Sequence, residues 1–155
     1  MTTSRITCDQ YRREALKRKL ERDVQKEACD YLFKIAPGRP LTVTDATRSF
    51  NVYGKQVTRV KPGWPDVTTM LPNGVMFAIE CKRPVGGKLD PAQARTLKKI
   101  HEWGGVVCIA RSVEDVADSL AIYAETNIRM RHKDALEIEK ALHPKDTKPD
   151  GEYGF

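Results

Sequence analysis

The chain predicts a single small α/β domain in which helices flank a mixed central sheet. It has 155 residues, of which 40% are hydrophobic, and this is enough apolar material for one core but not for two. Apolar residues recur at helical spacing near both ends, whereas alternating and β-branched residues dominate the middle. The resulting order is a helix, about three strands, a helix, a strand and a helix. Because a strand, a helix and a strand in succession imply a parallel crossover, the sheet should be mixed.

The first helix is predicted over about Asp9–Ile35. Apolar residues recur there every three to four positions, at Leu16, Leu20, Val24, Ala28, Leu32 and Ile35. The helix should end before Pro37-Gly38. Short strands with basic loops should follow, one beginning at Leu41 and another around Gln56–Val60, because these stretches are β-branched and alternating.

The clearest motif is a β-hairpin with strands Asp66–Leu71 and Val75–Lys82, joined by the turn Pro72-Asn73-Gly74. Glycine suits the left-handed position of such a three-residue loop. If these three residues form the loop, the numbers of paired residues sum to 146, as in Leu71 and Val75. Asp66 and Glu80 then stand opposite each other, with Cβ atoms about 4.5 to 5.5 Å apart.

After the hairpin, a helix should begin with Asp90 as its cap and Pro91 in its first position, and Gly104-Gly105 should end it. The apolar run Val106–Ala110 predicts a buried strand, and Ser112 should cap the helix that follows.

The apolar density falls after Thr126, although Ala135, Ile138 and Leu142 predict one short amphipathic helix. We therefore divide the chain into a domain at residues 1–125 and an extension at residues 126–155. The extension is expected to be a short helix followed by a flexible tail.

The chain is basic, with 27 Lys and Arg residues against 21 Asp and Glu residues, a net charge of +6 and a pI near 9.2. Such a balance favours a polyanionic partner such as nucleic acid, because Lys and Arg release counterions from phosphates. Charge alone leaves this open, since many basic proteins bind no nucleic acid.

No apolar run approaches the length of a membrane span, and the first residues lack the apolar core of a signal peptide. We therefore expect no membrane partner and a cytoplasmic location. The four cysteines, Cys8, Cys29, Cys81 and Cys108, form no C-x-x-C pair, and with three histidines they show no zinc spacing. Reduced structural thiols are expected, in agreement with that compartment.

The predicted hairpin gathers Asp66, Glu80 and Lys82 at one end, on one face of the sheet. Two carboxylates at that distance repel each other unless a hard cation such as Mg²⁺ lies between them. A bound Mg²⁺ can polarise a phosphoryl oxygen, so the cluster suggests phosphodiester hydrolysis. The alternative is that Asp66 caps a turn while Glu80 and Lys82 are ordinary charges on a strand. General residue statistics favour that alternative, but the hairpin context favours a site.

Several matches occur in order along the chain: Glu21-x-x-x-Gln25, Gly63-Trp64-Pro65-Asp66, Ile79-Glu80-Cys81-Lys82, Gly87-Lys88-Leu89, Gln93 and the Gly105-Val-Val-Cys-Ile strand. With these residues the chain resembles the virus-type replication-repair nucleases (VRR-NUC) of the PD-(D/E)xK superfamily. The resemblance runs from about Leu20 to Tyr123. It implies a restriction-endonuclease-like core with the order α-β-β-β-α-β-α.

The resemblance further implies a Mg²⁺- or Mn²⁺-dependent nuclease in which Asp66, Glu80 and the backbone carbonyl of Cys81 hold the ion. Lys82 would orient or activate the attacking water, and whether it acts as a neutral base or as a charged group stays open. Glu21 and Gln93 would reach the same site from two helices. From helix statistics alone, a solvated charge is the better interpretation of Glu21, and Gln93 could simply hydrogen-bond a neighbour.

Stand-alone members of the family at this length are typically viral and resemble Holliday-junction resolvases. The resemblance therefore implies a branched DNA substrate, a homodimer and, for a viral protein, the host cytoplasm. The candidate DNA-contacting residues are basic and lie around the motifs: Arg48, Lys55, Arg59, Lys61, Arg83 and Lys88. Taken singly, each of these residues is better interpreted as a solvated surface charge.

Two other functions stay open. One is a non-catalytic DNA-binding or assembly module on a nuclease scaffold, and the other is a nuclease that acts on RNA. The Gly86-Gly87-Lys88 run is not a nucleotide-binding P-loop, and no organic cofactor is expected.

Overall fold

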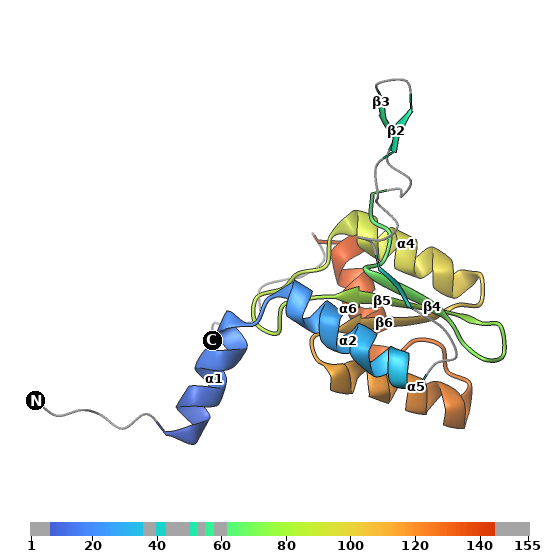
Figure 1. The fold of residues 1–155 in the computed structure, drawn as a ribbon. Coiled ribbons are helices and arrows are strands. Elements are labelled where there is room, and N and C mark those ends of the chain that lie inside the picture. The colour runs from blue at the N-terminus through green and yellow to red at the C-terminus, as the bar shows by residue number, and fades with distance from the viewer. Residues whose placement is uncertain (1–6, 36–39, 43–49, 53–54, 58–61, 145–155) are drawn as a thin grey trace, which may run out of the picture.

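The structure is a computed structural model of the 155-residue chain, and it describes residues 7–35, 40–42, 50–52, 55–57 and 62–144. The described helices and strands occur in the following order (Figure 1): α1 (Cys8–Arg18), α2 (Glu21–Ile35), β1 (Leu41–Thr42), β2 (Phe50–Val52), β3 (Lys55–Val57), β4 (Val67–Met70), β5 (Met76–Cys81), α4 (Pro91–Glu102), β6 (Val106–Ala110), α5 (Val113–Thr126) and α6 (His132–Leu142).

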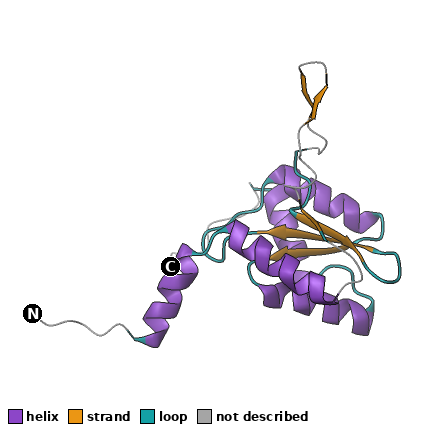
Figure 2. Cartoon of the chain, in the orientation of Figure 1, coloured by secondary structure: helices purple, strands orange, loops and turns teal. Residues whose placement is uncertain are grey.

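The central sheet has the strand order β1-β4-β5-β6. The pairs β1–β4 and β4–β5 are antiparallel, whereas β5 and β6 are parallel and are connected through α4. The predicted class, a small mixed sheet flanked by helices, is therefore confirmed. Figure 2 shows the sheet between two layers of helices.

The two faces of the sheet carry separate apolar clusters. On one face, α2 and α5 cover odd-numbered residues of β5 and even-numbered residues of β6, including Phe77, Ile79 and Cys108. On the other face, α4 and α6 cover Ala78 and Val107. Because both faces are buried, β5 and β6 are almost continuously apolar, as is typical of strands in the middle layer of an α/β fold.

The prediction of one unbroken helix over Asp9–Ile35 is wrong. The backbone of Lys19 is extended, with φ −66° and ψ 129°, and it separates α1 from α2. Asp23 stabilises the new helix start, because its carboxylate accepts the backbone N–H of Leu20 at 2.9 Å. An ion pair of 2.6 Å between Lys19 and Glu27 holds the break against α2. The apolar spacing continues through the break, so periodicity alone did not reveal it.

The predicted register of the hairpin is confirmed. Its pairs include Val67 with Ile79 and Met70 with Met76, so that paired numbers sum to 146 throughout. In the turn, Gly74 has a φ of +82° and donates its N–H to the carbonyl of Leu71. Gly74 therefore occupies the left-handed position that the three-residue loop requires.

The predicted starts of the two later helices are also confirmed. Asp90 caps α4 with Pro91 in the first position, and the Ser112 hydroxyl accepts the N–H of Asp115 at the start of α5. The predicted strand over Val106–Ala110 is β6, and it is parallel to β5 as expected.

The strands β2 and β3 form a separate two-stranded sheet, which Figure 1 shows projecting away from the central sheet. Of the expected DNA-contacting residues, Lys55 begins β3. Arg48, Arg59 and Lys61 lie outside the described residues.

The helix predicted around Ala135, Ile138 and Leu142 is confirmed as α6. It packs against α4, and Ile138 is buried in the same apolar cluster as Ala78 and Leu97. A bridge between Val107 and Met130 places the segment before α6 beside the outer edge of β6. Among the described residues, no helix is long and apolar enough to cross a membrane.

Candidate functional site

Asp66 is positioned by the tight approach of the preceding chain to α4. Gly63 has a φ of +88°, and a Cβ added there would lie 2.8 Å from the backbone carbonyl carbon and oxygen of Ala92. Only glycine fits both the conformation and the contact. After the buried Pro65, the Asp66 carboxylate turns toward β5 and accepts the N–H of Cys81 at 2.8 Å. The hydrogen bond joins the start of β4 to the end of β5.

Glu80 faces Asp66 when the observed register is extended by one pair beyond Val67 and Ile79. Its side chain is only 1% exposed. Neither of its carboxylate oxygens accepts a hydrogen bond within the described structure, although Oε1 lies 3.0 Å from Nζ of Lys82. A buried carboxylate with so few partners is costly unless another ligand satisfies it.

The electrostatics of the two acids follow from their burial and proximity. Burial and the nearby charge of Asp66 raise the pKa of Glu80 to about 8. Burial also raises the pKa of Asp66, although the N–H of Cys81 and the charge of Lys82 oppose the shift. The pair therefore holds a proton near neutral pH in the absence of a cation.

Lys82 lies between two carboxylates. Its Nζ is 3.0 Å from Glu80 and 3.6 Å from Glu21 at the start of α2, and its side chain is 5% exposed. Burial lowers the pKa of Lys82, but attraction to the nearby carboxylates of Glu80 and Glu21 outweighs burial, so the pKa is raised. In the absence of a cation, Lys82 is consequently an ammonium group in this arrangement.

The break between α1 and α2 has a direct consequence for this site. It makes Glu21 the first residue of α2, where it reaches Lys82 while remaining 48% exposed. The structure thus brings together Asp66, Glu80, Lys82 and Glu21, four of the five side chains expected there. The Cys81 side chain points into the apolar cluster, and burial raises the pKa of its thiol, so any metal contact would come from its backbone.

Gln93 has a structural contact within its own helix. Its Oε1 accepts the backbone N–H of Asp90 at 3.0 Å, which completes the capping box of α4. No described hydrogen bond links Gln93 to Asp66, Glu80 or Lys82. The interpretation that Gln93 bonds a neighbour therefore accounts for its observed contact, and a catalytic role stays a prediction.

The donor set fits a hard cation in part. Within the described ranges, no three His, Cys, Asp or Glu side chains gather closely enough to hold a metal ion. Two carboxylates remain, and the unsatisfied oxygens of Glu80 beside Asp66 are the feature that a cation would satisfy. Mg²⁺ commonly binds through one or two carboxylates and retains several waters, so a site with two acids is compatible with its usual coordination.

Two of the expected DNA-contacting residues flank this group. Arg83 and Lys88 are exposed, one directly after Lys82 and the other at the end of the following loop. A Cβ added at Gly87 would lie 2.7 Å from the backbone of Arg83 and 3.1 Å from Cβ of Lys82. The loop over residues 83–88 is therefore folded tightly against Lys82.

Sequence reasoning missed the residue that holds this loop. Arg111 follows β6 and donates to the carbonyl of Gly87 at 2.8 Å and to both carboxylate oxygens of Glu137 on α6 at 2.6 and 2.9 Å. The contacts join positions 24 and 26 residues apart. No local pattern signals such a contact, since it depends on how α6 packs.

A second missed group is the ion network around Arg131, whose side chain is 5% exposed. Its guanidinium contacts Asp134 at 2.8 Å, Asp115 at 2.9 Å and the carbonyl of Ile109 at 3.0 Å. Asp115 also accepts the N–H of Arg111. The network therefore holds the end of β6 against α5 and α6. It also restrains the backbone of Arg111, whose N–H bonds Asp115.

No protein-family model, curated protein or solved structure gives a significant match to this chain. The protein has a mixed α/β fold in which buried Glu80 and Lys82 and half-buried Asp66 lie at the end of a hairpin.

Proposed function

We propose that the chain is a metal-dependent nuclease of the PD-(D/E)xK type, similar to the VRR-NUC family, which hydrolyses DNA phosphodiester bonds. The observation that carries this proposal is the buried carboxylate of Glu80, opposite Asp66 and paired with Lys82, with oxygens that accept no hydrogen bond. An ordinary surface strand would leave its charged side chains in water, whereas here Glu80 and Lys82 are buried at the end of β5. With the separate sheet of β2 and β3 left aside, the order α2, β1, β4, β5, α4, β6 and α5 supports the core that the resemblance implies.

The residues divide the chemical work as follows. Asp66, Glu80 and the carbonyl of Cys81 would hold Mg²⁺ or Mn²⁺, which supplies Lewis-acid activation of the phosphate and of water. Lys82 carries a fixed positive charge beside the two acids and can orient the attacking water or stabilise charge that develops on the phosphate. Glu21, half exposed at the rim, holds Lys82 from the other side.

The proposed substrate follows from the charge of the protein and from the family resemblance. The net charge of +6 and the exposed Arg83 and Lys88 favour a nucleic-acid substrate. Branched DNA and a homodimer follow from the family resemblance. Cleavage of RNA and DNA substrates of matched sequence distinguishes the two possibilities, because the 2′-hydroxyl group is present only in RNA.

The proposal is tested by cleavage of linear, flap and four-way DNA in Mg²⁺, in Mn²⁺ and in EDTA. The variants are Glu80→Gln and Lys82→Ala, with the exposed Glu125→Gln and Lys34→Ala as matched controls. Each site variant should lose roughly 10²- to 10³-fold in rate, whereas the controls should cleave as the wild type does. Thermal unfolding of every variant shows whether it folds.

Equal activity in the site variants and the wild type would refute the site. The alternative, a non-catalytic DNA-binding module, predicts salt-dependent binding that is indifferent to divalent metal and to Asp66→Ala, with no cleavage.

A further inference from the structure

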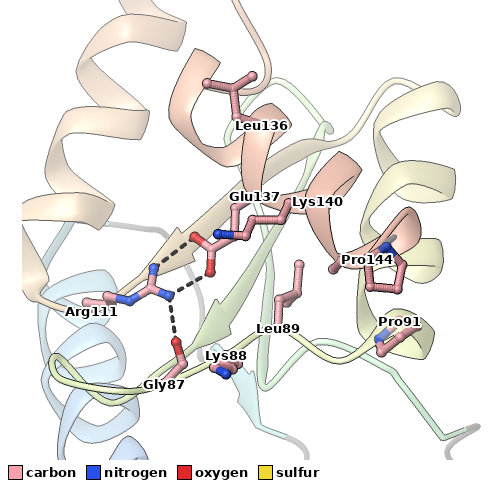
Figure 3. Close-up of a pocket in the computed structure, with 10 residues that line it drawn as sticks. Gly87, Lys88, Leu89, Pro91, Arg111, Leu136, Glu137, Lys140 and Pro144 are labelled. Atoms are coloured by element: carbon pink, nitrogen blue, oxygen red, sulfur yellow. Dashed lines mark hydrogen bonds and ion pairs between the residues drawn. The ribbon is translucent and has the colours of Figure 1, made fainter. Parts of the chain in front are cut away.

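A pocket of about 640 Å³ lies beside the proposed site, between the loop that follows Lys82 and helix α6 (Figure 3). One wall is formed by Gly87, Lys88 and Leu89, and the other by residues of α6 that include Leu136 and Lys140. Its volume falls within the range of about 300–1,000 Å³ typical of small-ligand sites.

The pocket combines an apolar floor with a basic rim. Leu89, Pro91 and Ala141 contribute to the apolar lining. The charged lining residues are Lys88, Arg111, Lys140 and Glu137. Because Arg111 and Glu137 pair with each other, the charges left for a ligand are those of Lys88 and Lys140. Glu137 is already paired with Arg111 through both oxygens, and the neighbouring Glu139 is paired with Lys98. The rim is therefore complementary to an anion.

The loop at residues 83–88 lies between the pocket and the proposed site. Gly87 lines the pocket, while its backbone packs directly against Lys82 and Arg83. Arg111 restrains the loop because its guanidinium donates a hydrogen bond to the carbonyl of Gly87 at 2.8 Å. A nucleic-acid strand that places a phosphate at Asp66 and Glu80 thus has this pocket one loop away.

We propose that the pocket receives one unpaired nucleotide of the substrate strand, with its base against the apolar floor and its phosphate at Lys88 and Lys140. Apolar side chains are suitable contacts for a base that has left its stack. A paired nucleotide would have to be extruded at a cost of a few kcal/mol, whereas a nucleotide in a flap or junction is already unpaired. The pocket would therefore select branched over continuous duplex DNA. This inference rests on the nuclease function proposed above.

The test measures binding by fluorescence anisotropy in Ca²⁺, with a flap DNA that carries unpaired thymidines and a blunt duplex of equal length. The variants are Leu136→Glu and Lys140→Glu. Leu136 is 58% exposed, and the matched control Ile128→Glu replaces another apolar residue that is 51% exposed. Lys34→Glu is the charge control, from the last turn of α2.

The wild type should bind the flap more tightly than the duplex, and each pocket variant should reduce that ratio about tenfold, in line with the energy of one base contact. The two control variants should leave the ratio unchanged. Equal losses for both DNAs, an unchanged ratio or a wild type without flap preference would overturn the pocket assignment.

Cleavage in Mg²⁺ separates the two hypotheses. A protein with a pocket-dependent flap preference that cleaves no DNA overturns the nuclease function and retains the nucleotide pocket. A protein that cleaves through Glu80, with the same flap preference in every variant, retains the nuclease function and overturns the pocket.

Discussion

Replacing Glu80 by glutamine should stabilise the metal-free protein while it abolishes metal binding. The Glu80 side chain is 1% exposed, and burial beside Asp66 raises its pKa from the ordinary 4.5 to about 8. A carboxyl with a raised folded pKa destabilises the fold as pH rises from 4.5 to 8, because only the unfolded chain ionises freely. Glutamine resembles the protonated form and does not ionise.

The magnitude follows from the gap between the ordinary pKa of 4.5 and pH 7. At about 1.4 kcal/mol for each pH unit, protonating Glu80 in the fold costs on the order of 3 kcal/mol. For a chain of this size, the Tm of Glu80→Gln should then exceed that of the wild type by roughly 6–12 °C in EDTA. At pH 4.5 the two proteins should unfold at nearly the same temperature.

Thermal unfolding in EDTA at pH 5, 7 and 8 measures the difference, with Glu125→Gln as a control on an exposed glutamate. Adding Mg²⁺ or Mn²⁺ should raise the Tm of the wild type and leave that of Glu80→Gln unchanged, since binding to the folded state alone stabilises it. A variant that is less stable than the wild type at pH 7, or a difference that does not grow with pH, would refute this account of the acid pair.

Three other substitutions test the surrounding structure. Gly63→Ala should cost more stability than Gly74→Ala, because both glycines have positive φ but only a Cβ at Gly63 would collide with Ala92. Urea denaturation should show losses of about 3 kcal/mol for Gly63→Ala and about 1 kcal/mol for Gly74→Ala. Equal losses would contradict the contact with Ala92. Asp115→Asn should cost about 2 kcal/mol at pH 7, measured against the exposed Asp118→Asn. Burial opposes ionisation of Asp115, but bonds from Lys133 and Arg131 lower its pKa, so the stabilisation should fade as pH falls below 3.8. Arg111→Lys keeps the charge but loses the paired bonds to Glu137, and it should increase amide exchange in residues 83–88 while exchange in β4 stays unchanged.

The hairpin was predictable from the sequence because its determinants are local. A three-residue turn with glycine in its last position sets the register of both strands, and alternation then assigns every side chain to a face. The opposition of Asp66 and Glu80 follows from this arithmetic. The caps at Asp90 and Ser112 were predictable for the same reason, since each bonds a residue two or three positions away.

The helix break at Lys19 was not predictable from periodicity, because the apolar repeat of α2 continues into α1. The sequence signal for the break was Asp23, whose carboxylate accepts the N–H of Leu20 at the start of α2. Acids are common at such positions, so this signal is not specific. The break matters because it puts Glu21 at a helix start that reaches Lys82.

Which acids face each other, which faces of the strands are apolar and where most helices begin could all be predicted from the order of the residues. These features depend on turns, caps and alternation, all of which act within a few residues. Tertiary packing was needed to show that Glu80 is buried with Lys82 as an ion-pair partner and no hydrogen bond to its oxygens, and that Arg111 ties the loop at Gly87 to α6. Burial and contacts between distant segments depend on how helices pack over the sheet, and no spacing along the chain encodes them.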